Sequence, residues 1–116
     1  MFNFAASLKI DLCIEPVGMR KSFNGLYGIA KHELKQNPMD GSLFLFCNRT
    51  RTRIKILYWD GTGFWVLAKR LERGTFWWHS KTAEAKAQIT IRHEALSMLL
   101  NGIDLKEGSM RAWFMR

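Results

Sequence analysis

Hydrophobic residues follow a two-residue period near the start of the chain and a helical period after it. Residues 8–14 (LKIDLCI) alternate apolar and polar side chains, which predicts a half-buried strand. Between residues 19 and 36 the apolar positions recur at helical spacing, which predicts an amphipathic helix closed by Asn37-Pro38. The side chains expected to pack this helix on a sheet are Phe23, Leu26, Tyr27, Ala30 and Leu34.

Residues 43–78 have the pattern of consecutive short strands. Apolar or alternating runs at 43–47, 49–59, 64–68 and 75–78 predict four strands, and we expect an antiparallel sheet that includes 43–47, 53–59 and 64–69. Asp60-Gly61-Thr62-Gly63 separates two of these runs and predicts a hairpin, because glycine supplies the positive φ that tight hairpins require. We therefore expect Asp60, Gly61 and Gly63 to have a structural role.

The rest of the chain adds shorter elements. Residues 79–88 are polar and predict an exposed connector, 89–91 a short strand, and 94–100 a helix stopped by Asn101-Gly102. We expect one domain over residues 1–104 and a loose tail over 105–116. The predicted fold class is α+β, a mainly antiparallel sheet of four to five short strands with a β-meander core and two helices packed on one face.

Charge changes this picture from a plain globular domain to one with a polyanionic partner. Lysine and arginine number 18 against 10 acidic residues, so the formal net charge is +8. Seven of these cations lie between positions 49 and 73, where Asp60 and Glu72 are the acidic residues. If 49, 51, 53 and 55 occupy one strand, they share a face, and the hairpin returns Lys69 and Arg70 beside them. The predicted nucleic-acid-binding residues are Arg49, Arg51, Arg53, Lys55, Lys69, Arg70 and Arg73.

Other interpretations of the basic residues stay open at this point. Like charges on an exposed strand face can simply block edge-to-edge aggregation. The same residues can meet an acidic protein surface, which would make the chain a docking module. Single-stranded nucleic acid could stack on Trp65 or Trp77, although these side chains also suit a core.

Catalytic chemistry has little support in the sequence. Cys13 and Cys47 lie in apolar runs, and the three histidines are scattered. Asp40, Asp60 and Glu72 could bind Mg²⁺ in a nuclease, the weaker alternative, but both aspartates precede glycine in predicted turns. We expect no active site, no cofactor and no metal. Without a signal peptide or a membrane-spanning run in the sequence, we expect a cytoplasmic protein that does not bind membranes.

Four segments resemble a known family. They are MRKSFNGL (19–26), GSLFLFCNR (41–49), RIKILYWDGTGFWVLAKRLERGTFWW (53–78) and LLNGID (99–104). Together they are similar to the TnpB-type accessory protein, the second open reading frame, of the insertion-sequence-66 transposon family. The resemblance covers roughly residues 8–104.

The resemblance implies an accessory protein encoded beside a separate, larger transposase that carries the catalytic residues. Transposon DNA and that transposase are the partners it implies. The chain departs from the family pattern at Gly18, where an acidic helix cap is common, and at Arg92-His93, where Ser or Thr with Pro is usual. The tail MRAWFMR is also unfamiliar.

Overall fold

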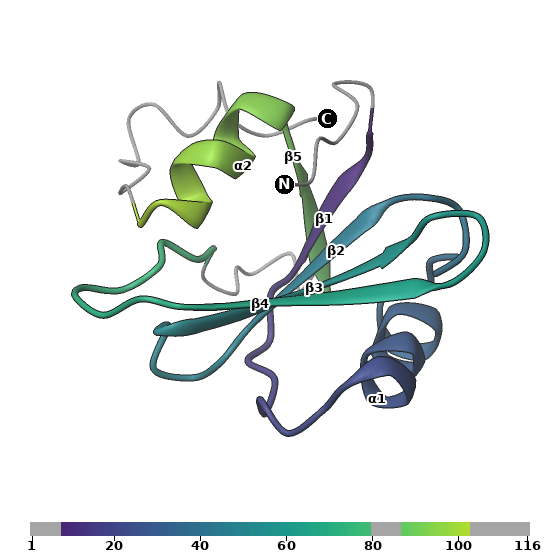
Figure 1. Cartoon of the computed structure of the whole chain (residues 1–116), viewed down its shortest axis with the longest axis horizontal. Helices are drawn as coiled ribbons and strands as arrows, with labels where there is room; N and C mark the ends of the chain where they lie inside the picture. The colour runs from purple at the N-terminus through teal and green to yellow at the C-terminus, as the bar shows by residue number, and fades with distance from the viewer. Residues whose placement is uncertain (1–7, 80–86, 103–116) are drawn as a thin grey trace.

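The computed structural model describes residues 8–79 and 87–102, which form one five-stranded sheet with helices on both sides (Figure 1). The strand order across the sheet is β4-β3-β2-β1-β5. In chain order the elements are β1 (Ile10–Cys13), α1 (Phe23–Gly28), the π-helical turn η1 (Ile29–Glu33), β2 (Leu43–Cys47), β3 (Arg53–Trp59), β4 (Phe64–Arg70), β5 (Gln88–Ile91) and α2 (His93–Leu100).

Consecutive strands β2, β3 and β4 form the predicted antiparallel meander, and β5 pairs antiparallel with β1. The pair β1 and β2 is parallel, with Ile10 opposite Leu43. A parallel pair needs a crossover, and the segment holding α1 and η1 supplies it. The predicted α+β class with a mainly antiparallel sheet is therefore confirmed.

The central strand β2 decides where the helices lie. All five of its residues are buried, as its continuous apolar run predicts. Leu43, Leu45 and Cys47 face a core that includes α2, whereas Phe44 and Phe46 face a core that includes α1 and η1. The expectation that both helices pack on one face is wrong, because a strand that is apolar on both faces needs cover on both.

The first helix begins later than the helical period suggests. It starts at Phe23 and not at Met19, and its last part is the π-helical turn η1. The residues before it are held in another way: the Lys55 ammonium donates hydrogen bonds to the carbonyl oxygens of Met19 and Lys21, at 2.7 and 2.8 Å. Leu26, Ala30 and Leu34 are buried as predicted, but Phe23 is exposed.

The segment 75–78 is not a strand, although its side chains alternate. Phe76 and Trp78 are buried in the core on the α2 side of the sheet. The segment is held by single contacts: Phe76 N–H donates to the Arg51 carbonyl at 2.7 Å, and Trp78 Nε1 donates to the Cys13 carbonyl at 2.8 Å. Phe76 and Trp78 are buried here without pairing to a strand, so the two-residue period does not require a neighbouring strand.

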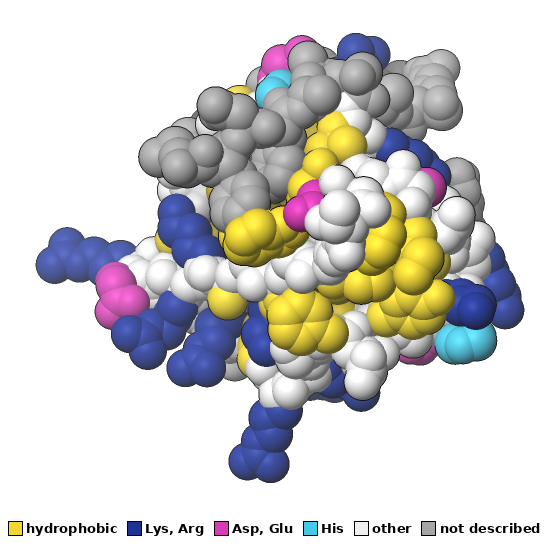
Figure 2. Space-filling model, turned by 45° about the vertical axis from the view of Figure 1, so that its right-hand side comes forward, with side chains coloured by type: hydrophobic (Ala, Val, Ile, Leu, Met, Phe, Trp, Pro, Cys, Tyr) yellow, Lys and Arg dark blue, Asp and Glu magenta, His cyan; other side chains and the backbone are white. Residues whose placement is uncertain are grey.

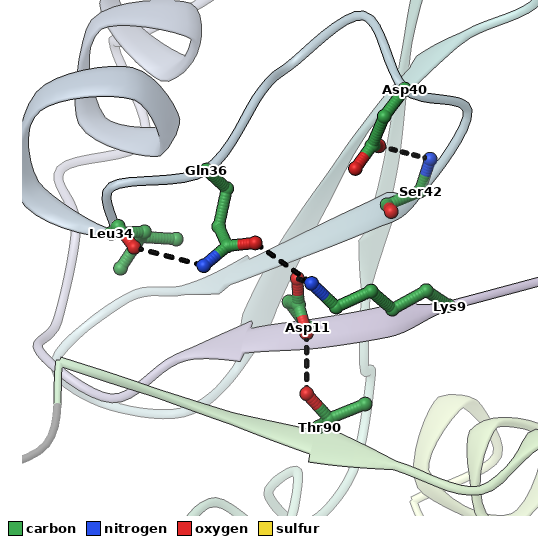
Figure 3. A network of polar contacts seen from close by, with 7 residues as sticks. All are labelled: Lys9, Asp11, Leu34, Gln36, Asp40, Ser42 and Thr90. Carbon is green, nitrogen blue, oxygen red and sulfur yellow. Dashed lines mark hydrogen bonds and ion pairs between the residues drawn. The ribbon is translucent and has the colours of Figure 1, made fainter.

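A buried carboxylate links the two strands at the β5 edge (Figure 3). Asp11 is fully buried and accepts a hydrogen bond from Thr90 Oγ1 at 2.7 Å, with the Lys9 ammonium 3.4 Å away. Lys9 in turn donates to Gln36 Oε1 at 2.7 Å, just beyond η1. Burial raises the pKa of Asp11, so these partners offset a desolvation cost and fix β1, β5 and the crossover together.

The predicted hairpin between β3 and β4 is confirmed. Asp60 N–H donates to the Gly63 carbonyl at 3.1 Å, which closes a two-residue loop. Gly61 has φ +102°, a conformation that side chains with a Cβ rarely adopt, whereas Gly63 has no positive φ. The expected tail at 105–116 and most of the expected connector at 79–88 lie outside the described residues.

Gly61→Val should destabilise the protein by about 1–2 kcal/mol, because a β-branched residue is strained at positive φ. Urea unfolding followed by circular dichroism measures the change. Gly63→Val is the matched control, since a Cβ there meets no atom within 4 Å. Equal destabilisation by the two variants would contradict the assignment of strain to Gly61.

Candidate nucleic-acid interface

The predicted strand of four cations is divided by a turn. Arg49 and Arg51 lie in the turn between β2 and β3, and Arg51 has φ +60°. Asn48 holds this turn, because its Oδ1 accepts hydrogen bonds from the N–H groups of Thr52 and Arg53 at 2.9 and 3.1 Å. The expectation that 49, 51, 53 and 55 share one strand face is therefore wrong for the first two.

Two residues predicted to contact phosphate, Lys55 and Lys69, donate hydrogen bonds to backbone carbonyls of the protein itself. The two hydrogen bonds that Lys55 donates attach the segment before α1 to β3. Lys69 Nζ donates to the Leu100 carbonyl at 2.7 Å, at the C-terminal end of α2, where a cation stabilises the helix. Lys69 pairs with Ile54 and lies on the α2 side of the sheet, so it does not share a face with Arg70.

The remaining arginines gather at one end of the sheet. Arg53 and Arg70 are direct cross-strand partners and point to the same face. Two backbone hydrogen bonds join the β2–β3 turn to the chain after β4: Leu71 N–H donates to the Thr52 carbonyl at 2.9 Å, and Phe76 N–H to that of Arg51 at 2.7 Å. Figure 2 shows lysine and arginine side chains gathered at this end of the molecule. We call Arg49, Arg51, Arg53, Arg70 and Arg73 the basic end.

Two residues of the MRKSFNGL segment, for which no binding role was predicted, extend the basic end. Arg20 and Lys21 belong to the segment that Lys55 holds, and both are exposed. They had no predicted role because they lie more than thirty residues from the basic strand in sequence. The contact from Lys55, together with the bond from Val17 N–H to the Cys47 carbonyl at 2.9 Å, brings them to this face of the sheet.

Two hollows flank the β2–β3 turn at the basic end. One, of about 420 Å³, is lined by Met19, Arg53, Lys55, Ala68, Lys69, Arg70 and Glu72, among others. The other, of about 330 Å³, is lined by Glu15, Asn48, Arg49, Arg51, Trp78 and His79, among others. Cationic side chains therefore line one hollow at the turn itself and another over the adjoining ends of β3 and β4.

Charges at the basic end are only partly balanced. Arg70 Nε bonds to Glu72 Oε2 at 2.9 Å, an exposed ion pair. Arg49, Arg53 and Arg73 form no ion pair with another described residue. Arg53 and Arg70 occupy a position where like charges oppose each other directly, which disfavours folding.

Asp60 lies at the opposite end of the sheet and has a different use. Its Oδ1 accepts hydrogen bonds from the N–H groups of Thr62 and Gly63 at 2.9 and 3.0 Å, and its Oδ2 accepts one from Trp65 Nε1 at 2.8 Å. These donors lower the pKa of Asp60 to about 2. Trp65 is thereby fixed at the hairpin and lies away from the basic end, so it does not support base stacking there.

Other candidate groups belong to the core. Burial raises the pKa of Cys13 to about 11 and that of Cys47 to about 12, so both thiols stay protonated at neutral pH.

Within residues 8–79 and 87–102, no three histidine, cysteine or acidic side chains lie close enough to hold a metal ion. Neither helix in these ranges has the length and apolar composition needed to cross a membrane.

Comparison with known proteins identifies the family. The sequence profile described as IS66 Orf2 like protein matches residues 8–110. The chain belongs to the IS66 Orf2-like family. Membership implies an accessory protein of transposition, as the sequence motifs indicated.

Two Sinorhizobium fredii proteins are similar over nearly the whole chain. Uncharacterized protein y4hO is 44% identical over 104 residues, which cover 90% of this chain and 88% of y4hO. Uncharacterized protein y4jC is 30% identical over 104 residues, covering 90% of this chain and 86% of y4jC. No solved structure matches the chain.

Lys55→Met should destabilise this IS66 Orf2-like protein by about 1.5–3 kcal/mol, because two carbonyl oxygens lose a charged donor. Arg53→Gln is the matched control on the same strand face, since Arg53 forms no ion pair among the described residues. Urea unfolding compares the two. A loss no larger in Lys55→Met than in the control would show that the contacts to Met19 and Lys21 contribute nothing.

Asp60→Asn should lower the melting temperature at neutral pH and have less effect in acid. The folded-state pKa of Asp60, about 2, lies below its ordinary 3.8, so its carboxylate stabilises the fold above pH 3.8. That contribution is lost as the pH falls from 3.8 through about 2. Thermal melts of both proteins across this range measure the difference, and a difference independent of pH would contradict the role of the charge.

Proposed function

We propose that this transposition accessory protein binds nucleic acid, most simply the DNA of its transposon, through the basic end. The observation that supports this most directly is the position of Arg53 opposite Arg70. Like charges placed directly across two strands cost stability, and one acidic neighbour, Glu72, offsets only part of this. A polyanion bound at this end would remove the repulsion.

The chemistry of the basic end suits a phosphate backbone. Arginine offers a planar fork of N–H donors that matches phosphate oxygens, and five of the seven predicted site residues at this end are arginines. They come from two joined turns and two strand ends, so they form a wide surface and not a single pocket. Contacts of this kind fix the position of DNA without reading its sequence.

The geometry favours a surface contact over insertion of the hairpin into a groove. The two-residue tip of the β3–β4 hairpin follows Asp60 and lies at the end away from the arginines. What the basic end presents is the β2–β3 turn, flanked by its two hollows. We propose that successive phosphates contact Arg49 and Arg51 on one side of the turn and Arg53 and Arg70 on the other.

The double variant Arg49→Gln/Arg53→Gln should weaken DNA binding without lowering the melting temperature. Each lost phosphate contact should make the slope of log K against log salt shallower by about 0.9 on duplex DNA, so two should change it by about 1.8. Removing Arg53 also relieves the repulsion with Arg70, so stability should stay equal or rise slightly. Fluorescence anisotropy with labelled duplex and single-stranded DNA at several salt concentrations measures the affinity and its salt slope. Thermal melts measure the stability.

The matched control is Lys31→Gln/Arg92→Gln, which removes the same charge from exposed positions outside the basic end. Its salt slope should equal that of the unchanged protein. The same slope change in both double variants would mean that net charge alone drives binding. Absence of binding at low salt would reject the proposal and leave docking of the basic end on an acidic surface of the transposase. Incubation of the labelled DNA with Mg²⁺ tests the nuclease alternative.

A further inference from the structure

Strand β4 forms one edge of the sheet and is the longer of the two edges. It has seven residues, whereas β5 at the other edge has four. Its ladder partner is β3, and no described strand lies on its other side. In Figure 1, β4 runs along the front of the sheet without a helix across it.

The direction of each backbone N–H and C=O group in β4 follows from the hydrogen bonds at the two ends of its ladder with β3. The pairs Asp60–Gly63 and Thr52–Leu71 are both joined by hydrogen bonds, and antiparallel pairs alternate between bonded and non-bonded. Trp65, Leu67 and Lys69 therefore direct their N–H and C=O groups to β3. The groups of Phe64, Val66, Ala68 and Arg70 point outward, and no described residue bonds to them.

The sequence of β4 does little to block this edge. Natural edge strands are protected by charged side chains, especially lysine, by proline, by inward-pointing charges or by very short length. Here five uncharged residues, 64–68, are followed by Lys69 and Arg70 at one end only. The outward backbone groups are therefore open to a partner strand.

We infer that a second copy of this chain pairs its β4 antiparallel with this one, on a two-fold axis at Leu67. The open edge would then become the centre of a continuous sheet of both copies. This arrangement places Phe64 opposite Arg70 of the second copy, and Trp65 opposite its Lys69. The side chains of each face remain on the same face across the junction.

Charge and backbone direction select this register. Outward groups must meet outward groups, so even-numbered residues must lie opposite even-numbered ones. Among such registers, the one centred on Leu67 pairs all seven residues of both strands. It also sets Arg70 of each strand against Phe64 of the other, where a cation and an aromatic ring attract. A parallel arrangement would instead set Lys69 and Arg70 against the same charges.

The inference is tested by measuring the oligomeric state of the full chain and of variants that alter the β4 edge. Sedimentation equilibrium of the full chain without nucleic acid should show a concentration-dependent monomer–dimer equilibrium. Ala68→Pro should shift it to monomer, because proline removes an outward N–H while the ladder to β3 is kept. Ala68→Ser is the matched control, since it keeps that N–H at the same exposed position, and it should dimerise as the unchanged protein does.

A cysteine crosslink tests the register itself. In the proposed dimer the two Leu67 residues form a non-bonded pair with Cα atoms about 4.5 Å apart, within the range for a disulfide. Leu67→Cys should therefore form a dimer under mild oxidation, whereas Ala68→Cys should crosslink far less. Cys13 and Cys47 are buried and do not compete.

Three results would overturn the inference: a monomer at all soluble concentrations, a dimer unaffected by Ala68→Pro, or faster crosslinking of Ala68→Cys than of Leu67→Cys. Thermal melts of each variant separate a lost interface from a lost fold. Because no nucleic acid is present, failure here leaves the proposed binding at the basic end untouched.

Discussion

The burial of β2 on both faces is the constraint on which the rest of this structure depends. Five consecutive apolar residues cannot face water on either side, so each face of the sheet must be covered. The crossover with α1 and η1 covers one face, and α2 with the 75–78 segment covers the other. Once both faces are covered, strand ends and turns are the places left for exposed charge. The basic end is a consequence of that arrangement.

The sequence predicted the meander well because its signals are local. Continuous apolar residues in β2, alternation in β3 and the glycines after Asp60 each act within a few positions. The side of the sheet on which α1 packs is not a local property, since it depends on the parallel pairing of β1 with β2. The alternation at 75–78 was misleading for the same reason: burial of every second side chain does not specify a neighbouring strand.

The candidate site shows the same limit at the level of single side chains. Composition located the excess of cations correctly, but lysine and arginine in one segment have different uses in the structure. Lys55 and Lys69 donate to backbone carbonyls far away in sequence, whereas Arg53 and Arg70 are left facing each other. Whether a lysine donates to the backbone depends on where the Met19 and Leu100 carbonyls lie. No local sequence pattern encodes the positions of these carbonyls.

The pairing of β1 with β5 also has a consequence for the order of folding. The bond from Thr90 to the buried Asp11 carboxylate joins residues 79 positions apart. Contacts of such long range are slow to form, and a chain made on the ribosome emerges from its N-terminus. The meander of β2, β3 and β4 can assemble while synthesis continues, but the outer side of β1 has no partner until β5 has emerged. The first strand of the sheet is thus among the last parts of this protein to be completed.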